Sequence, residues 1–156
     1  MLSIQISDIK DFMSHLLSKD TFDHFYFIEA SIKMGVSYQI QGRINEGFYD
    51  TSVEQTLNRE FCYWKEIRHR IFDIIKGKRL PLSCKIVLGL SKQSISYLIA
   101  HNNSSFREED IEGIYVNILY DPKNLLITTG ISYKNFSLDK SLEYAFDEYL
   151  VKFLKE

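Results

Sequence analysis

One pair of residues has the spacing of a metal ligand set. Glu66 and His69 form an E-x-x-H step within a predicted helix, and side chains three residues apart share a helix face. Carboxylate-bridged di-iron sites use this step twice and add two more glutamates, whereas this chain contains it once. The step therefore predicts an exposed helix face, and we expect no metal and no cofactor.

Nucleophilic catalysis has little support in the sequence. The stretch GLSKQ, residues 89–93, approaches the G-x-S-x-G elbow, but Gln93 replaces the second glycine and the context predicts a hairpin. Ser91 is accordingly interpreted as a turn residue. The phosphate-binding, dinucleotide-binding and HExxH zinc motifs are absent. We assign no catalytic residue from motifs.

The richest charged stretch is KEIRHRIFDIIKGKR, residues 65–79, with six basic and two acidic side chains. Its candidates for phosphate contact are Arg68, Arg70, Lys76, Lys78 and Arg79. The same charges could instead complement the acidic helix near the C-terminus, within the chain or across a dimer. Because the chain has no recognisable nucleic-acid module and a net charge of −2, nucleic-acid binding is the less favoured interpretation.

Residues 28–45 predict two strands folded back on each other, with one apolar and one polar face. The polar face is either the solvated side of a sheet or a binding surface, since arginine and tyrosine anchor many interfaces. The candidates for ligand or interface contact, including the helix pair above, are Glu29, Gln39, Gln41, Arg43, Glu66 and His69.

The elements that must position these residues follow from the apolar periodicity. A helix is predicted over 8–19 with Ser7 as its cap, and a long one over 51–76, begun by the capping box Thr51–Glu54 and ended at Gly77. At 1.5 Å per residue the long helix would span about 40 Å. Strands are predicted within 22–33, 36–44, 83–91, 94–101, 113–120 and 125–133, and a last helix over 138–155.

These elements predict an α+β fold in the order α-ββ-α-ββββ-α. One antiparallel sheet of about six strands would carry the long central helix and the C-terminal helix on one face. Hotdog-like and helix-grip folds are the nearest analogies, and a fold does not set a function.

Composition bounds the class of protein. With 156 residues, 45% apolar and 26% charged, the chain predicts one globular domain over 1–156. It contains no apolar run long enough for a spanning helix and no basic-then-apolar start of a signal peptide. Cys62 and Cys84 stand far apart without a C-x-x-C spacing. A cytoplasmic protein with two buried thiols is therefore expected.

Four stretches carry a resemblance to a known family: DIKDFMSHLLSKDTFDHFYFIEASI, GRIN, KGKRLPLSCKIVLGLS and NLLITTGISYKNFSLDKSLEYAFDEYLVKFL. They resemble an uncharacterised family of small proteins from anaerobic clostridial Firmicutes, a domain of unknown function. The resemblance covers nearly the whole chain and implies a single-domain bacterial protein. It transfers no activity, cofactor or site residue.

Three functions stay open at this point. The first is a non-catalytic binding or interaction module, partnered by a second copy or another protein and not by a membrane. The second is an enzyme or small-ligand carrier of hotdog-like or helix-grip type, with Glu29, Arg43, Glu66 and His69 as first candidates. The third is nucleic-acid association through residues 65–79.

Overall fold

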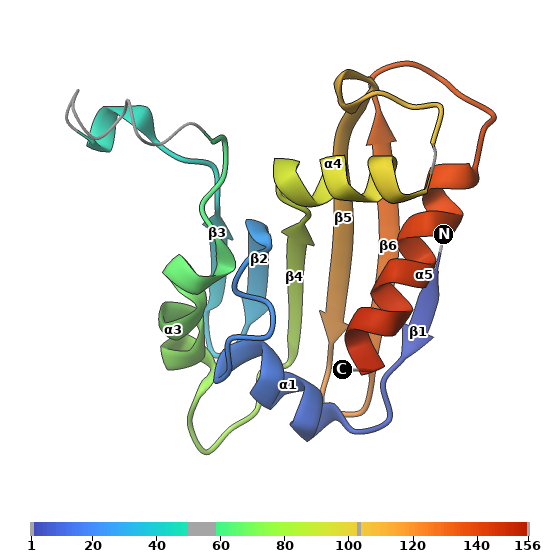
Figure 1. Ribbon diagram of the computed structural model, residues 1–156. Coiled ribbons are helices and arrows are strands. Elements are labelled where there is room, and N and C mark those ends of the chain that lie inside the picture. Colours follow the sequence, from blue (N-terminus) through green and yellow to red (C-terminus); the bar gives the residue numbers. More distant parts are fainter. Residues whose placement is uncertain (1, 50–58, 103, 156) are drawn as a thin grey trace.

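The computed structural model describes residues 2–49, 59–102 and 104–155. Six strands and four α-helices are defined in this part of the chain (Figure 1). The strands are β1 (Ser3–Gln5), β2 (Tyr26–Lys33), β3 (Ser37–Gln41), β4 (Ser83–Gly89), β5 (Ile111–Tyr120) and β6 (Leu125–Tyr133). The helices are α1 (Ile9–Leu17), α3 (Trp64–Ile75), α4 (Lys92–His101) and α5 (Ser141–Lys155), with short 3₁₀ turns η1 (Glu46–Phe48) and η2 (Glu108–Asp110).

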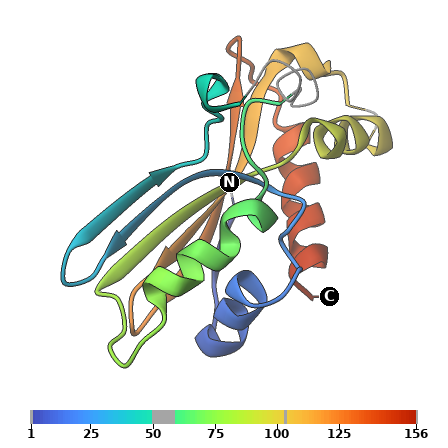
Figure 2. The same cartoon turned by 90° about the vertical axis from the view of Figure 1, so that its left-hand side faces the viewer.

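The strands form one sheet in the order β1-β6-β5-β4-β2-β3, and every neighbouring pair is antiparallel. The predicted α+β class with a single six-stranded antiparallel sheet is confirmed. Figure 2 shows that all four described α-helices lie on one side of this sheet. Its other side, which we call the open face, is covered by none of them.

The core fills the space between the helices and the sheet. Alternate residues of each strand point toward the helices, as period-two patterning requires, and the largest fully buried side chains include Trp64, Phe27, Phe146 and Leu16. Hotdog-like and helix-grip proteins hold their pocket between these layers. Among the described residues, aromatic and aliphatic side chains fill most of that space, and a hollow of about 110 Å³ lies between β6 and α5.

The long central helix is the main correction to the predicted elements. Residues 51–58, including the predicted capping box, lie outside the described part of the chain. Residues 59–63 are not helical, and α3 begins only at Trp64 and has 12 residues, about 18 Å at 1.5 Å per residue. Phe61 was predicted on the apolar stripe of this helix and belongs instead to an extended segment that pairs with the sheet just before α3.

The second correction concerns residues 94–101, which were predicted as a strand and form most of α4. The backbone N–H of Ser94 donates to the Ser91 hydroxyl at 3.2 Å, so Ser91 caps the helix. Ile95 and Leu98, three residues apart, are its buried positions. The sixth strand is β1, so the element order differs from the predicted one although the strand number agrees.

Helix ends agree in part with prediction. Asp8 caps α1, since its carboxylate accepts a hydrogen bond from the Asp11 N–H at 3.0 Å, and the predicted cap Ser7 does not. Gly77 follows α3 with φ +144°, a backbone angle that favours glycine. No helix within the described ranges is both long and apolar enough to cross a membrane.

Candidate functional site

At one end of the sheet, a short segment, Glu60–Trp64, lies between β2 and the part of the chain that follows β3. Past the last hydrogen bond of the β2–β3 pair, from Gly42 N–H to the Ile28 carbonyl, the two strands separate. The segment pairs with β2 through the Tyr26–Tyr63 bridge and with the chain after β3 through the Arg43–Phe61 bridge. Its alternation turns Trp64 into the core and leaves Phe61 and Tyr63 on the open face.

Sheet register brings a row of aromatic residues together on that face. Gly89 of β4 stands opposite Tyr26 of β2 on one side and opposite Tyr115 of β5 on the other. Cross-strand partners point to the same face, so the two tyrosines flank a residue without a side chain. Tyr63 extends the row beyond Tyr26, with the two ring centroids 5.3 Å apart.

A small cleft of about 70 Å³ opens beside Gly89, and we call it the aromatic cleft. Tyr26, Phe61, Tyr115 and Ile28 line it together with the glycine. Burial raises the pKa of Tyr26, with Tyr63 adding to the effect, and burial followed by the charge of Glu112 raises the pKa of Tyr115. Both phenols are therefore neutral hydrogen-bonding groups at physiological pH.

Two arginines lie against aromatic rings near the aromatic cleft, and both line a separate hollow of about 620 Å³. The guanidinium of Arg43 pairs with Glu60 and lies 5.2 Å from the centre of the Phe61 ring. Arg59 lies 4.6 Å from the Tyr63 ring and donates to both Glu66 carboxylate oxygens, at 2.5 and 3.2 Å. The arrangement combines cationic groups with aromatic faces.

A second, polar hollow lies on the same face over β2, β3 and β4. It measures about 260 Å³, and we call it the polar hollow. Its polar lining residues are Glu29, Ser31, Gln39, Gln41 and Lys85. Register explains the grouping, because Glu29 stands opposite Gln41 and Ser31 opposite both Gln39 and Lys85. Three predicted interface residues, Glu29, Gln39 and Gln41, are thus brought together.

Two other predicted candidates, Glu66 and His69, do not line the polar hollow. Glu66 caps α3, accepting from the Tyr63 N–H at 3.2 Å and pairing with Arg59. His69 is exposed on α3, which lies on the helix-covered side of the sheet (Figure 2). Because Glu29 projects from the opposite face, His69 and Glu29 do not share a site. Within the described ranges, no group of three or more His, Cys, Asp or Glu residues could hold a metal ion.

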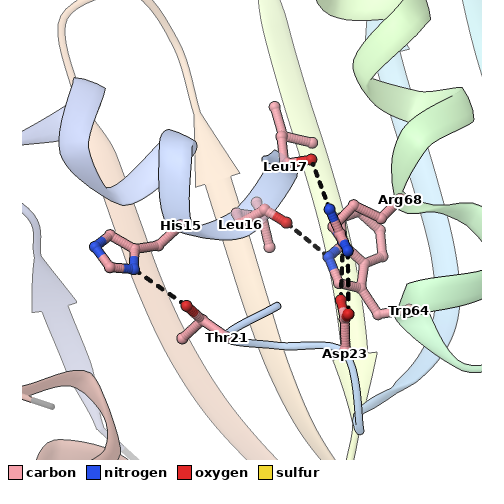
Figure 3. Close-up of polar contacts among 7 residues, drawn as sticks. All are labelled: His15, Leu16, Leu17, Thr21, Asp23, Trp64 and Arg68. Atoms are coloured by element: carbon pink, nitrogen blue, oxygen red, sulfur yellow. Dashed lines mark hydrogen bonds and ion pairs between the residues drawn. The ribbon is translucent and has the colours of Figure 1, made fainter. Parts of the chain in front are cut away.

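The basic residues of the stretch 65–79 also differ in their surroundings. Arg68 turns inward and forms an ion pair with Asp23, at 2.8 and 3.0 Å from its two carboxylate oxygens. Figure 3 shows this pair beside the Trp64 indole, whose N–H donates to the Leu16 carbonyl at 2.8 Å. These contacts attach the end of α1 to α3, so Arg68 has a structural role. Lys76 pairs with Asp73 at 3.0 Å.

Arg70, Lys78 and Arg79 are exposed. Of the five predicted phosphate contacts, these three remain as freely projecting cations of the stretch.

Sequence reasoning missed most of the aromatic cleft. Tyr26 and Tyr115 are 89 positions apart, and only the strand order places them around Gly89. Phe61 and Tyr63 were assigned to a helix. The alternation of aromatic residues at 61 and 63 was the local signal for an extended segment.

A further hollow of about 360 Å³ lies between α1 and the end of α5. His15 is at its edge, with Nδ1 3.1 Å from the Thr21 hydroxyl (Figure 3) and Nε2 3.7 Å from Asp11. The polar hollow, by contrast, includes three of the predicted interface residues, Glu29, Gln39 and Gln41, and a fourth, Arg43, lies against the Phe61 ring of the aromatic cleft. The open face is therefore the candidate site.

The geometry defines an α+β protein in which one layer of helices packs on one face of the sheet. The other face carries polar and aromatic side chains and is covered by none of the described α-helices. The chain belongs to a family of unknown function, DUF5721, whose family model matches residues 15–156. The predicted resemblance to a domain of unknown function is thereby confirmed. No curated protein and no solved structure matches the chain.

Proposed function

We propose that this protein is a non-catalytic binding module that associates with a second copy of itself through the open face. The observation that carries the proposal is one-sided layering: the described α-helices lie on one side of the sheet (Figure 2). The other side presents Tyr26, Tyr115 and Arg43 in one region. Aromatic residues and arginine are the types that dominate binding energy at interfaces.

A group of apolar residues beside the polar hollow suits the centre of an interface. Val87, Leu119 and Leu126 point to the open face, as their register partners show. Around them lie polar groups, including Asn117, which donates to the Thr128 hydroxyl at 3.2 Å. An apolar centre inside a polar rim is the usual anatomy of a protein interface.

The charges of the open face support a second copy as the partner. Glu29 and Lys85 both line the polar hollow, and Arg43 pairs with Glu60, which lines the aromatic cleft. A two-fold dimer places a surface against itself and therefore needs both signs of charge on it. A surface with mixed charges meets that requirement.

Native mass spectrometry and light scattering test the proposal. We expect a dimer for the natural sequence and a monomer for Leu119→Glu, because Leu119 lies on the open face and is 36% exposed. Leu138→Glu is the matched control, since this side chain is 82% exposed in the loop before α5. A monomer at all concentrations, or a dimer that Leu119→Glu leaves intact, contradicts the proposal.

The same spectra test the ligand-carrier and enzyme alternative. A retained molecule of a few hundred daltons would favour it. The aromatic cleft would then be the first place to examine, although its volume of about 70 Å³ is well below that of common ligand pockets, at roughly 300–1,000 Å³.

A further inference from the structure

One end of the sheet gathers two connections that lie far apart in the sequence. The backbone N–H of Leu82, in the α3–β4 loop, donates to the Lys33 carbonyl at 2.8 Å, next to the β2–β3 turn. Figure 2 shows both connections at the same end of the sheet. We call this end the basic tip and define it by Lys33, Val36, Lys78, Arg79, Leu80 and Leu82.

The basic tip exposes aliphatic side chains. Leu80 is 66% exposed, Leu82 70% and Val36 65%. Pro81 between the two leucines is buried, so the loop turns its proline inward and both leucines toward solvent. Leucine and valine are among the residues most often found inside a protein, and here three are exposed at one end.

The charges around these side chains have one sign. Lys33, Lys78 and Arg79 are exposed, and residues 33–38 and 76–85 contain no aspartate or glutamate. Lys76 is already paired with Asp73. The neighbouring β5–β6 turn adds Asp121 and Lys123, whose charges cancel. A chain with a net charge of −2 therefore has a locally cationic end.

We propose that the basic tip binds the surface of an anionic lipid bilayer. Cationic side chains near such a surface are attracted by its negative potential, and exposed aliphatic side chains can enter the boundary between headgroups and acyl chains. Leu80 and Leu82 are the inserting groups, and Lys78, Arg79 and Lys33 contact the headgroups.

Two other occupants fit the basic tip less well. Single-stranded nucleic acid is bound by aromatic side chains that stack on bases, whereas the basic tip offers aliphatic ones. A second copy docked tip to tip would bring like charges together, because a two-fold contact repeats the same surface. An anionic lipid surface interacts favourably with both the cationic and the aliphatic side chains of the basic tip.

Flotation of the full-length protein with lipid vesicles tests this proposal. We expect binding to vesicles of phosphatidylcholine with phosphatidylserine, weak binding to phosphatidylcholine alone, and loss of binding at high salt. Each cationic side chain should contribute about fivefold to partitioning. Lys78→Glu/Arg79→Glu should then lower the partition coefficient by at least about tenfold. Leu80→Ser/Leu82→Ser should lower it by a similar factor.

Matched controls lie elsewhere on the surface. Lys134→Glu and Leu138→Ser change exposed side chains of the same kinds in the loop before α5 and should leave binding unchanged. Circular dichroism and Trp64 fluorescence verify that each variant is folded. Leu80→Trp adds a direct readout, because its emission should shift to the blue with anionic vesicles, measured as a difference from the natural sequence.

The results of these experiments distinguish a lipid surface from nucleic acid as the ligand of the basic tip. Equal binding to neutral and anionic vesicles, or unchanged binding by the leucine variant, overturns the proposal. Absence of vesicle binding also overturns it. If a labelled oligonucleotide binds instead, with a salt dependence that Lys78→Glu/Arg79→Glu removes and the leucine variant leaves intact, the basic tip is a nucleic-acid site. Dimer formation through the open face is measured separately and does not depend on these results.

Discussion

Single residues in this protein are constrained by backbone contacts more than by motifs. Gly42 follows β3 where the β2–β3 pair separates, and a methyl group added there would lie 1.9 Å from the Phe27 carbonyl oxygen. Arg68 was predicted as a phosphate contact and instead pairs with Asp23, while its neighbour Arg70 stays exposed. At this scale the sequence shows which residue types are present, and neighbours from distant segments decide what they do.

Gly42→Ala should destabilise the protein by about 2–4 kcal/mol, because the new methyl group overlaps a backbone atom that cannot move without breaking the pairing of Glu60–Trp64. Gly35→Ala is the control, since nothing lies within 4 Å of its added carbon, and its effect should stay within about 0.5 kcal/mol. Urea unfolding followed by Trp64 fluorescence measures both. Equal effects would show that Gly42 is not closely packed.

Arg68→Ala should lower the free energy of unfolding by about 2–3 kcal/mol. The change removes a half-buried ion pair and leaves Asp23, whose side chain is 13% exposed, without its partner. Arg70→Ala, on the exposed side of the same helix, should cost less than about 0.5 kcal/mol. A double-mutant cycle with Asp23→Asn measures the coupling, and a coupling near zero would contradict the structural role of Arg68.

Elements depart from prediction where tertiary pairing competes with local periodicity. Residues 59–63 carry helix-like spacing but make sheet hydrogen bonds to β2 and to Gly42. Residues 94–101 alternate well enough to predict a strand, yet an N-cap at Ser91 and the burial of Ile95 and Leu98 make them helical. A short apolar segment can fit both the helical and the strand periodicity, so the segments that it packs against decide whether it forms a helix or a strand.

The cap of α4 gives a test at this scale. Ser91→Ala should destabilise the protein by about 1 kcal/mol, because the Ser94 N–H loses its acceptor in a buried position. Ser91→Thr keeps a capping oxygen and should recover most of the loss. Thermal and urea unfolding measure the two variants, and a neutral Ser91→Ala would argue against a capped helix here.

The whole molecule has two layers, a helical side that is packed and a sheet side that is open. Burial is accordingly concentrated in the helix-facing layer, where Cys84 is 3% exposed and Trp64 fully covered. Burial raises the pKa of Cys84 to about 12, and burial with the charge of Glu66 raises that of Cys62 to about 11. Both thiols are protonated in the folded protein well above neutral pH.

Stability should therefore fall in alkali. Above about pH 9 the thiols ionise in the unfolded chain but not in the folded one, so each favours unfolding by up to about 1.4 kcal/mol per pH unit until its folded pKa is reached. Buried tyrosines with raised pKa values, such as Tyr120, add to the slope above pH 10. Urea unfolding between pH 7 and 11 measures it.

Cys84→Ala should reduce this alkaline slope, whatever it does to stability at pH 7. A slope identical to that of the natural sequence would show that the thiol ionises equally in both states.

The sequence by itself determined the α+β class, the five strands β2, β3, β4, β5 and β6, and the polar side of the first hairpin. It could do so because alternation along a strand assigns each side chain to one face without knowledge of the strand's neighbours. Glu29, Gln39 and Gln41 are therefore grouped as predicted. From the net charge and the lack of a long apolar run we expected no membrane partner, and the cationic and aliphatic side chains that two loops bring together at the basic tip lead us to propose the opposite.

Only the tertiary structure decided what joins these pieces. The pairing of Glu60–Trp64 with the sheet, the row Tyr115–Gly89–Tyr26 and the meeting of two loops at the basic tip all depend on strand order. These contacts join segments separated by tens of residues, and local periodicity carries no information about which segment becomes a strand's neighbour.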